Sequence, residues 1–329
     1  MSGSPLTATT TSSPDDRISG LSNLQTSNYI RASLALSVRK VVDIIPTHTV
    51  REGGGFKVRR PSRMNSVLSP FLLIDEMGPV DYGPGEAVGA PWHPHRGFET
   101  VTYLLDGRMQ HEDSAGNSGE LNPGDVQWMT AGRGIIHSEE PHEEFMRTGG
   151  RTHGFQIWVN LPAEHKMMAP RYQEIPANKS PTIREEGVWA RVIAGECLGV
   201  SSSIDTVIPI TLIHVKMEEG SRLIQEITSN LNAMIYVFGG RVKLEDRLSV
   251  RNHPLPFGLG VKQFVSDGEL ALLSDGERIE IRADSESEFL ILAGPEINEP
   301  IARYGPFVMN TREEINQAFL DYQNGTLAN

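Results

Sequence analysis

The chain has 329 residues, of which 38% are hydrophobic and 22% charged, as is usual for a folded globular protein long enough for two domains. The formal net charge of −12 argues against direct binding to DNA or RNA, because proteins that bind nucleic acids neutralise phosphates with Lys and Arg. A single cysteine excludes an internal disulfide and suits a reducing compartment, so we expect the protein in the cytoplasm, the nucleus or both.

Residues 1–37 are rich in Ser and Thr, and we expect them to form a disordered tail. Asp15 and Asp16 stand beside Arg17 in this tail, whereas an organellar transit peptide is rich in Arg and poor in acids. No apolar run approaches the roughly 20 residues that cross a bilayer, so we expect no association with membranes.

Short strands separated by turn signals follow the tail. Residues 56–60, 69–75, 100–105, 126–129, 135–139 and 154–161 are rich in apolar and β-branched side chains. Residues 162–186 are rich in Pro, Lys and Glu, and a second strand-rich block extends from Val188 to about Ala293. The spacing predicts an all-β protein with two barrel or sandwich domains, which we place at 38–165 and 187–300 with a linker at 166–186.

The C-terminal segment, 301–329, carries the clearest helix signal. Thr311 and Glu314 match a capping box, in which each side chain satisfies a backbone N–H group of the other residue. Four apolar residues then recur at helical spacing and predict one buried face: Ile315, Ala318, Phe319 and Tyr322. We expect this face to pack on a barrel wall.

The first motif with chemical meaning is a pair of histidines. His93 and His95 are two residues apart, so on a strand both imidazoles point to one face. Imidazole is a common ligand of iron, zinc, copper and nickel, and two converging imidazoles favour such an ion. An isolated His-x-His also occurs in ordinary surface loops, so this motif alone does not establish a site.

A second pair, His137 and Glu139, repeats this spacing on a later strand. Three histidines and a carboxylate with open positions suit a redox-active divalent metal better than structural zinc. Glu99 has the same strand parity as the first histidine pair and competes with Glu139 for the carboxylate position. Spacing leaves both open, and the other role for Glu99 is to accept a hydrogen bond from a histidine or from Arg96.

Four segments closely resemble the pirin family of the cupin superfamily: residues 93–101 (His-Pro-His-Arg-Gly-Phe-Glu-Thr-Val), 122–139, 156–161 and 305–311. The resemblance extends from about Val38 to Asn324 and is strongest in the first domain and near the C-terminus. It implies two tandem cupin-type (jelly-roll) barrels, the second degenerate, with the C-terminal helix packed on a barrel. It also implies that His93, His95, His137 and Glu139 bind Fe²⁺, with another divalent transition metal as the alternative.

The chain departs from the general cupin pattern in ways that the pirin family shares. The third histidine follows Gly132-Arg-Gly-Ile-Ile, and the carboxylate follows this histidine instead of the first pair. The second domain has only scattered histidines, His214 and His253, so we expect it to bind no metal. Residues 1–37 have no counterpart in the family.

The resemblance implies a dioxygenase of the quercetin 2,3-dioxygenase type, which opens a flavonol ring with dioxygen. On this hypothesis Glu139 is the catalytic base for a flavonol hydroxyl. Trp92, Tyr82 and Phe98 are candidates for stacking on a flat aromatic substrate, or for ordinary packing. Gln156 is a candidate neighbour of the metal ligands, or a plain polar core residue.

The alternative function is an iron- and redox-sensing transcriptional co-regulator that binds a transcription factor. On this hypothesis the redox state of the metal alters a protein surface, and the acidic charge suits a basic partner. The chain carries no evident nuclear import cluster, since Lys57, Arg59, Arg60 and Arg63 lie in or beside a predicted strand. A metal-binding scaffold without catalytic activity is the third hypothesis.

Overall fold

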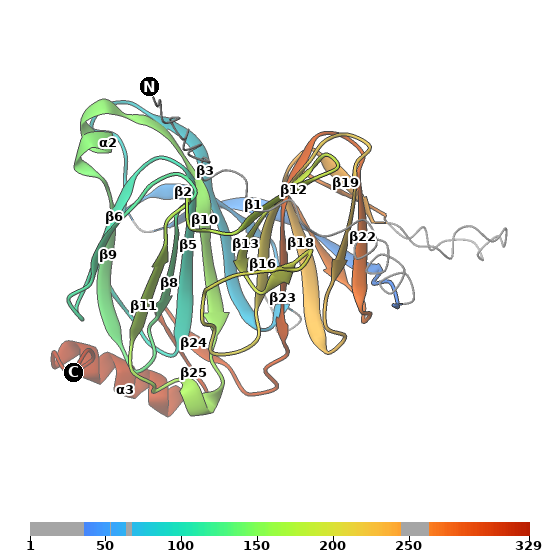
Figure 1. The fold of residues 1–329 in the computed structure, drawn as a ribbon. Coiled ribbons are helices and arrows are strands. Elements are labelled where there is room, and N and C mark those ends of the chain that lie inside the picture. Colours follow the sequence, from blue (N-terminus) through green and yellow to red (C-terminus); the bar gives the residue numbers. More distant parts are fainter. Residues whose placement is uncertain (1–35, 53, 64–67, 245–262) are drawn as a thin grey trace, which may run out of the picture. The chain divides into compact units, whose positions relative to one another are not determined.

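The structure, a computed structural model, describes residues 36–52, 54–63, 68–244 and 263–329 (Figure 1). Nearly all of the predicted tail, residues 1–35, therefore lies outside the described residues. The described residues from Val38 onward belong to one compact unit, and most of its regular structure is strand. None of its described helices has the length and apolar character needed to cross a membrane.

Two groups of strands form the two barrels. The first group is β2 (Phe56–Pro61), β3 (Phe71–Tyr82), β4 (Ala90–His95), β5 (Phe98–Asp106), β6 (Met109–Asp113), β7 (Ser118–Leu121), β8 (Val126–Thr130), β9 (Ile135–Pro141), β10 (Gly150–Asn160) and β11 (Arg171–Ile175). The second group is β12 (Thr182–Glu185), β13 (Val188–Ala194), β16 (Thr211–Met217), β17 (Arg222–Glu226), β18 (Leu231–Gly239), β19 (Arg241–Leu244), β20 (Phe264–Ser266), β21 (Glu269–Leu273), β22 (Arg278–Ala283) and β23 (Ser287–Pro295). The remaining elements are β1 (Val41–Glu52), β14 (Glu196–Cys197), β15 (Val200–Ser201), β24 (Ala302–Tyr304), β25 (Phe307–Met309), α2 (Glu143–Thr148), the 3₁₀ helix η2 (Ala163–His165) and α3 (Arg312–Gln323).

One sheet of 13 strands passes through both barrels, in the order β11-β8-β5-β10-β3-β2-β1-β21-β18-β23-β16-β13-β12. Strand β1 joins its two halves, because its first part pairs with β21 and its second part with β2. A four-stranded sheet completes each barrel, β4-β9-β6-β7 in the first and β17-β22-β19-β20 in the second. The predicted all-β architecture with two tandem barrels is confirmed.

The segment 166–186, expected to be a linker, contains two strands. Strand β11 pairs with β8 of the first barrel, and β12 pairs with β13 of the second barrel. Only Ile175 of the five β11 residues is buried, which explains the weak apolar periodicity of this segment. Strand β11 is held in place by its hydrogen bonds to β8. No pattern in the sequence predicts this pairing.

The two faces of the long sheet have different chemistry in the first barrel. Val101 of β5 and Ile157 of β10 belong to an apolar cluster that also contains Tyr236 and Leu290 of the second barrel. Side chains alternate between the two faces of a strand. Thr102 therefore points the other way, into the first barrel, where it contacts a residue of β9. The face of the long sheet that packs against the second barrel is thus apolar, and the face inside the first barrel carries polar side chains.

The interior of the second barrel is filled with aliphatic side chains. Val215, Ile235, Val237 and Ile291 belong to one cluster in which each of these residues is 0% exposed. Because they come from adjacent strands of one sheet and share parity, they cover its inner face continuously. Among the described residues, the polar barrel interior belongs to the first barrel.

Helix α3 has the predicted capping box. Thr311 Oγ1 accepts from the backbone N–H of Glu314, whose carboxylate accepts from the backbone N–H of Thr311. The buried face is narrower than expected, since Ile315 and Ala318 are buried but Tyr322 is 40% exposed. The helix packs on β24 and β25 and lies beneath the first barrel in Figure 1.

Candidate metal centre

Two neighbouring strands bring the predicted histidines together. Strands β4 and β9 are antiparallel, and His93 lies directly opposite His137 in their register. The ring centroids of His93, His95 and His137 lie 4.3 to 4.9 Å apart in pairs. One ligand atom from each histidine lies within 4.8 Å of the other two, so the three histidines could hold a metal ion.

Hydrogen bonds to the three Nδ1 atoms leave the three Nε2 lone pairs for a metal. The Nδ1–H of His93 donates to the Pro91 carbonyl at 2.7 Å, and the Nδ1–H of His95 donates to the Pro306 carbonyl at 3.3 Å. His137 Nε2 is buried and has no partner among the described residues. Partners of this kind fix the tautomer and the orientation of ligand histidines, so the arrangement fits a metal ion.

His111, which the sequence did not single out, orients the third ligand. Its Nε2–H donates to Asp113 Oδ2 at 3.4 Å, so its Nδ1 accepts from the Nδ1–H of His137 at 3.5 Å. Two backbone N–H groups of the following turn donate to Asp113 Oδ1. His111 and Asp113 share strand parity, but this pattern is common on exposed strands and gave no distinct signal.

Burial keeps two of the three imidazoles in the neutral form that binds metals. Desolvation, with a further contribution from His93, lowers the pKa of His95 to about 3. Burial also lowers the pKa of His137 well below its ordinary value. Metal ligands must be deprotonated. These two side chains therefore meet that requirement at neutral pH.

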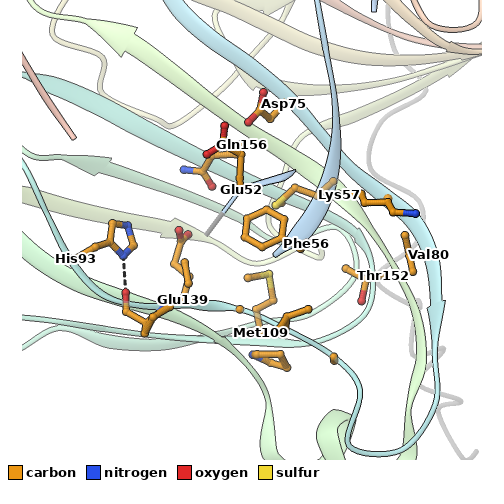
Figure 2. Close-up of a pocket in the computed structure, with 18 of the residues that line it drawn as sticks. Glu52, Phe56, Lys57, Asp75, Val80, His93, Met109, Glu139, Thr152 and Gln156 are labelled. Carbon is orange, nitrogen blue, oxygen red and sulfur yellow. Dashed lines mark hydrogen bonds between the residues drawn. The ribbon is translucent and has the colours of Figure 1, made fainter. Parts of the chain in front are cut away.

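Glu139 lies beside the three histidines but is not one of the grouped ligands. Its Oε1 accepts from Thr102 Oγ1 at 2.7 Å, across the barrel interior. Gln156 Oε1 lies 3.0 Å from the same hydroxyl. Figure 2 shows Glu139, Gln156 and His93 among the side chains that line one cavity. The structure thus brings three of the four predicted ligands together and holds the fourth at their side.

Glu99, the competing carboxylate, takes no part in this cluster. It is 0% exposed, and its Oε1 accepts from Thr130 Oγ1 at 2.6 Å. Desolvation raises the pKa of its carboxyl. Gly97, with φ of +90°, lies between the end of β4 at His95 and the start of β5 at Phe98, which belongs to the other sheet. Strand parity therefore does not carry from His95 to Glu99, which is why the parity argument failed.

A cavity of about 670 Å³ opens onto the cluster, and His93, His95, Glu139 and Gln156 line it. Five aromatic side chains also line it: Phe56, Tyr82, Trp92, Phe145 and Trp158. Tyr82 and Trp92 are therefore where the stacking hypothesis needs them, whereas Phe98 packs behind Trp158 with ring centroids 4.3 Å apart. Trp158 packs edge-on against His95 at 5.3 Å. It was missed, although it shares strand parity with Gln156.

His214, the described histidine of the second domain, belongs to no such group. His214 is buried and bonded on both sides, to the Tyr103 hydroxyl at 2.7 Å and to Glu288 Oε1 at 2.9 Å. His253 lies outside the described residues. That the second domain binds no metal stays an expectation.

The chain resembles known proteins along most of its length. Residues 55–159 match the Pirin family model, and residues 212–328 match the model of the pirin C-terminal cupin domain. Pirin of Mus musculus is 39% identical over 295 residues, covering 88% of this chain and 93% of that protein. A protein of Pseudomonas aeruginosa named as a putative quercetin 2,3-dioxygenase is 38% identical over 305 residues, covering 88% and 98%. The crystal structure of quercetin 2,3-dioxygenase from Acinetobacter baumannii superimposes with a TM-score of 0.80 at 35% identity, covering 88% and 99%.

Proposed function

Because the chain belongs to the pirin family of the cupin superfamily, we propose that it is a metal-dependent dioxygenase of the quercetin 2,3-dioxygenase type. One observation carries the proposal. Three histidines with free Nε2 atoms meet at the wall of an aromatic-lined cavity of about 670 Å³. That volume is in the range of small-molecule sites. The names of two similar bacterial proteins support the same reaction class.

We propose His93, His95, His137 and Glu139 as the ligand set and ferrous iron as the metal, with another divalent transition metal as the alternative. The histidine geometry and the buried, unpartnered Nε2 of His137 support the set. Glu139 would complete it through its second carboxylate oxygen, since the first accepts a hydrogen bond from Thr102. When bound, such a metal supplies Lewis acidity and redox activity toward a flavonol and dioxygen.

We propose that other side chains around the cluster accept a proton and contact the substrate. Glu139 is placed to accept the proton of a flavonol hydroxyl, because its carboxylate faces the cavity and is oriented by Thr102. Trp92, which is 53% exposed, offers its aromatic ring to the flat rings of the substrate. Trp158 lines the same cavity, but its ring packs against Phe98 and has the Arg303 guanidinium 4.6 Å from its centroid.

The overall reaction consumes a flavonol and dioxygen, places both oxygen atoms in the ring-opened ester and releases one ring carbon as carbon monoxide. The test is an oxygen-uptake assay of the iron-loaded protein against a panel of flavonols, with metal-free protein as the control. We expect uptake that depends on both iron and flavonol, together with carbon monoxide. Iron-loaded protein that consumes no dioxygen with any flavonol would rule out the enzyme.

The co-regulator hypothesis stays as the alternative, because the relatives include pirins and the net charge of −12 suits a basic partner. It predicts that the affinity for a transcription factor differs between ferrous, ferric and metal-free protein. Equal affinity in the three states, measured by titration calorimetry, would remove it.

A further inference from the structure

Arg96, the residue after His95, connects both ligand-bearing segments to the C-terminal helix. Its side chain is only 5% exposed, and its Nη1 bonds to Asp321 Oδ2 of α3 at 2.7 Å. Its Nε–H donates to the carbonyl of Arg133, in the turn that leads into β9 and His137. One guanidinium therefore ties the end of β4, the start of β9 and α3 together.

The C-terminal segment also forms a backbone hydrogen bond beside the exposed edge of β4, the strand that carries His93 and His95. Strand β4 is the edge strand of its four-stranded sheet. The backbone N–H of Val308 donates to the Arg96 carbonyl at 3.1 Å, and the Pro306 carbonyl accepts from His95 Nδ1 at 3.3 Å. A ligand histidine is thus oriented by a residue more than 200 positions away in the sequence.

A buried lysine bonds to both backbone segments of this contact. Lys166 Nζ donates to the Gly97 carbonyl at 2.8 Å and to the Val308 carbonyl at 3.1 Å. The approach is close at Gly97, where an added Cβ would lie 2.0 Å from the Val308 carbonyl oxygen. The backbone around Val308 therefore packs directly against Gly97, two residues after the ligand His95.

The position of Asp321 is unfavourable for the helix itself. It lies in the last turn of α3, which contains no basic residue, and a carboxylate there opposes the helix dipole. The ion pair with Arg96 offsets this cost. Without Asp321, the guanidinium would be a nearly buried cation without its carboxylate. The connection between α3 and the backbone that leads into His137 would then be lost.

We propose that Asp321 is a positioning residue of the metal centre: it fixes Arg96, which holds the backbone beside His95 and before His137, so that helix α3 affects the affinity for the metal. The proposal rests on the metal site proposed above. It predicts that a single substitution on the outside of the barrel weakens metal binding without touching a ligand.

The test measures Co²⁺ affinity and the visible absorption of the Co²⁺ protein for D321N, with E313Q as the matched control. Glu313 lies on the same helix, is exposed and loses the same charge. We expect D321N to weaken Co²⁺ binding about tenfold and to change the absorption bands, as loss of a group that orients a ligand does. E313Q should leave both unchanged. Equal affinities for D321N and E313Q would overturn the proposal.

A second variant and a second measurement distinguish a loss of metal affinity from a general loss of stability. R96K keeps the charge but loses the fork that reaches Arg133 and Asp321 together, so it should weaken Co²⁺ binding as D321N does. The rise in unfolding temperature caused by Co²⁺ should shrink in both variants. A purely structural role would lower the unfolding temperature equally with and without the metal, which would contradict the proposal. If the unmodified protein binds no Co²⁺, the metal site itself fails, and not the role of Asp321.

Discussion

His93 and His137 face each other across β4 and β9, with ring centroids 4.3 Å apart. In an antiparallel pair, opposite residues have Cβ atoms about 4.5–5.5 Å apart. The backbone register therefore sets the spacing of two ligands before any metal arrives. Since the Nδ1 partners also fix the ring orientations, we regard the site as preorganised.

The first prediction concerns the buried ligand. His137→Ala should lose both bound iron and flavonol cleavage, because it removes an Nε2 atom that is buried and has no partner among the described residues. Elemental analysis and oxygen uptake measure the two effects. The control is His165→Ala, whose side chain is 41% exposed beside Glu164. Full iron content in the His137 variant would show that the metal is held elsewhere.

The second prediction concerns the hydroxyl that holds Glu139. Thr102→Val keeps the shape of the side chain but removes the donor to Glu139 Oε1. We expect kcat to fall about 10- to 100-fold while the protein still binds iron, because the carboxylate loses its orientation and the histidines do not. Thr100→Val, a matched change on the same face of β5, should retain activity. An unchanged kcat in Thr102→Val would exclude the positioning role.

The third prediction concerns stability in acid. Burial lowers the pKa of His214 to about 4, although its bond to Glu288 opposes this shift. The unfolded chain takes up this proton near pH 6.5, so the folded state loses stability as the pH falls from 6.5 toward 4. The loss is on the order of 3–4 kcal/mol at most.

Denaturant unfolding of metal-free protein between pH 7.5 and 4 measures this effect, and His214→Gln is the comparison. The variant should lose less stability over the same interval, because its amide does not titrate. Identical pH dependence in both proteins would mean that His214 is not buried as a neutral side chain.

The fourth prediction concerns the filled second barrel. Ile235→Ala should lower the free energy of unfolding by about 2–5 kcal/mol, because Ile235 is 0% exposed in the apolar cluster. Val42→Ala, at a position 67% exposed, should have little effect. Folded Ile235→Ala should still bind iron in the first barrel. A loss of iron in that folded variant would contradict the separation of roles between the barrels.

The sequence predicted the strands and the shared face of His93 and His95 because these depend on local patterns. The meeting of His137 with this pair depends on the distant pairing of β4 with β9, and it was implied by the family resemblance. His93 and His95 share parity within one strand, and the capping box of α3 lies within four residues. Predictions failed where long-range pairing decides the structure. Strand β11 is held by hydrogen bonds to β8, and Gly97 moves Glu99 into a different sheet.

The sequence also did not predict the groups that orient the ligands. His111, Thr102 and Asp321 approach the site from separate parts of the chain, and only the folded backbone brings them to it. Their residue types are ordinary at their positions. No spacing rule could therefore have selected them.

The most direct test of the metal centre is an anomalous-difference map from crystals of freshly purified protein, recorded at the iron absorption edge. We predict a single peak among the Nε2 atoms of His93, His95 and His137, about 2 Å from each. A map with no peak there, or with iron bound elsewhere on the chain, would contradict the central claim.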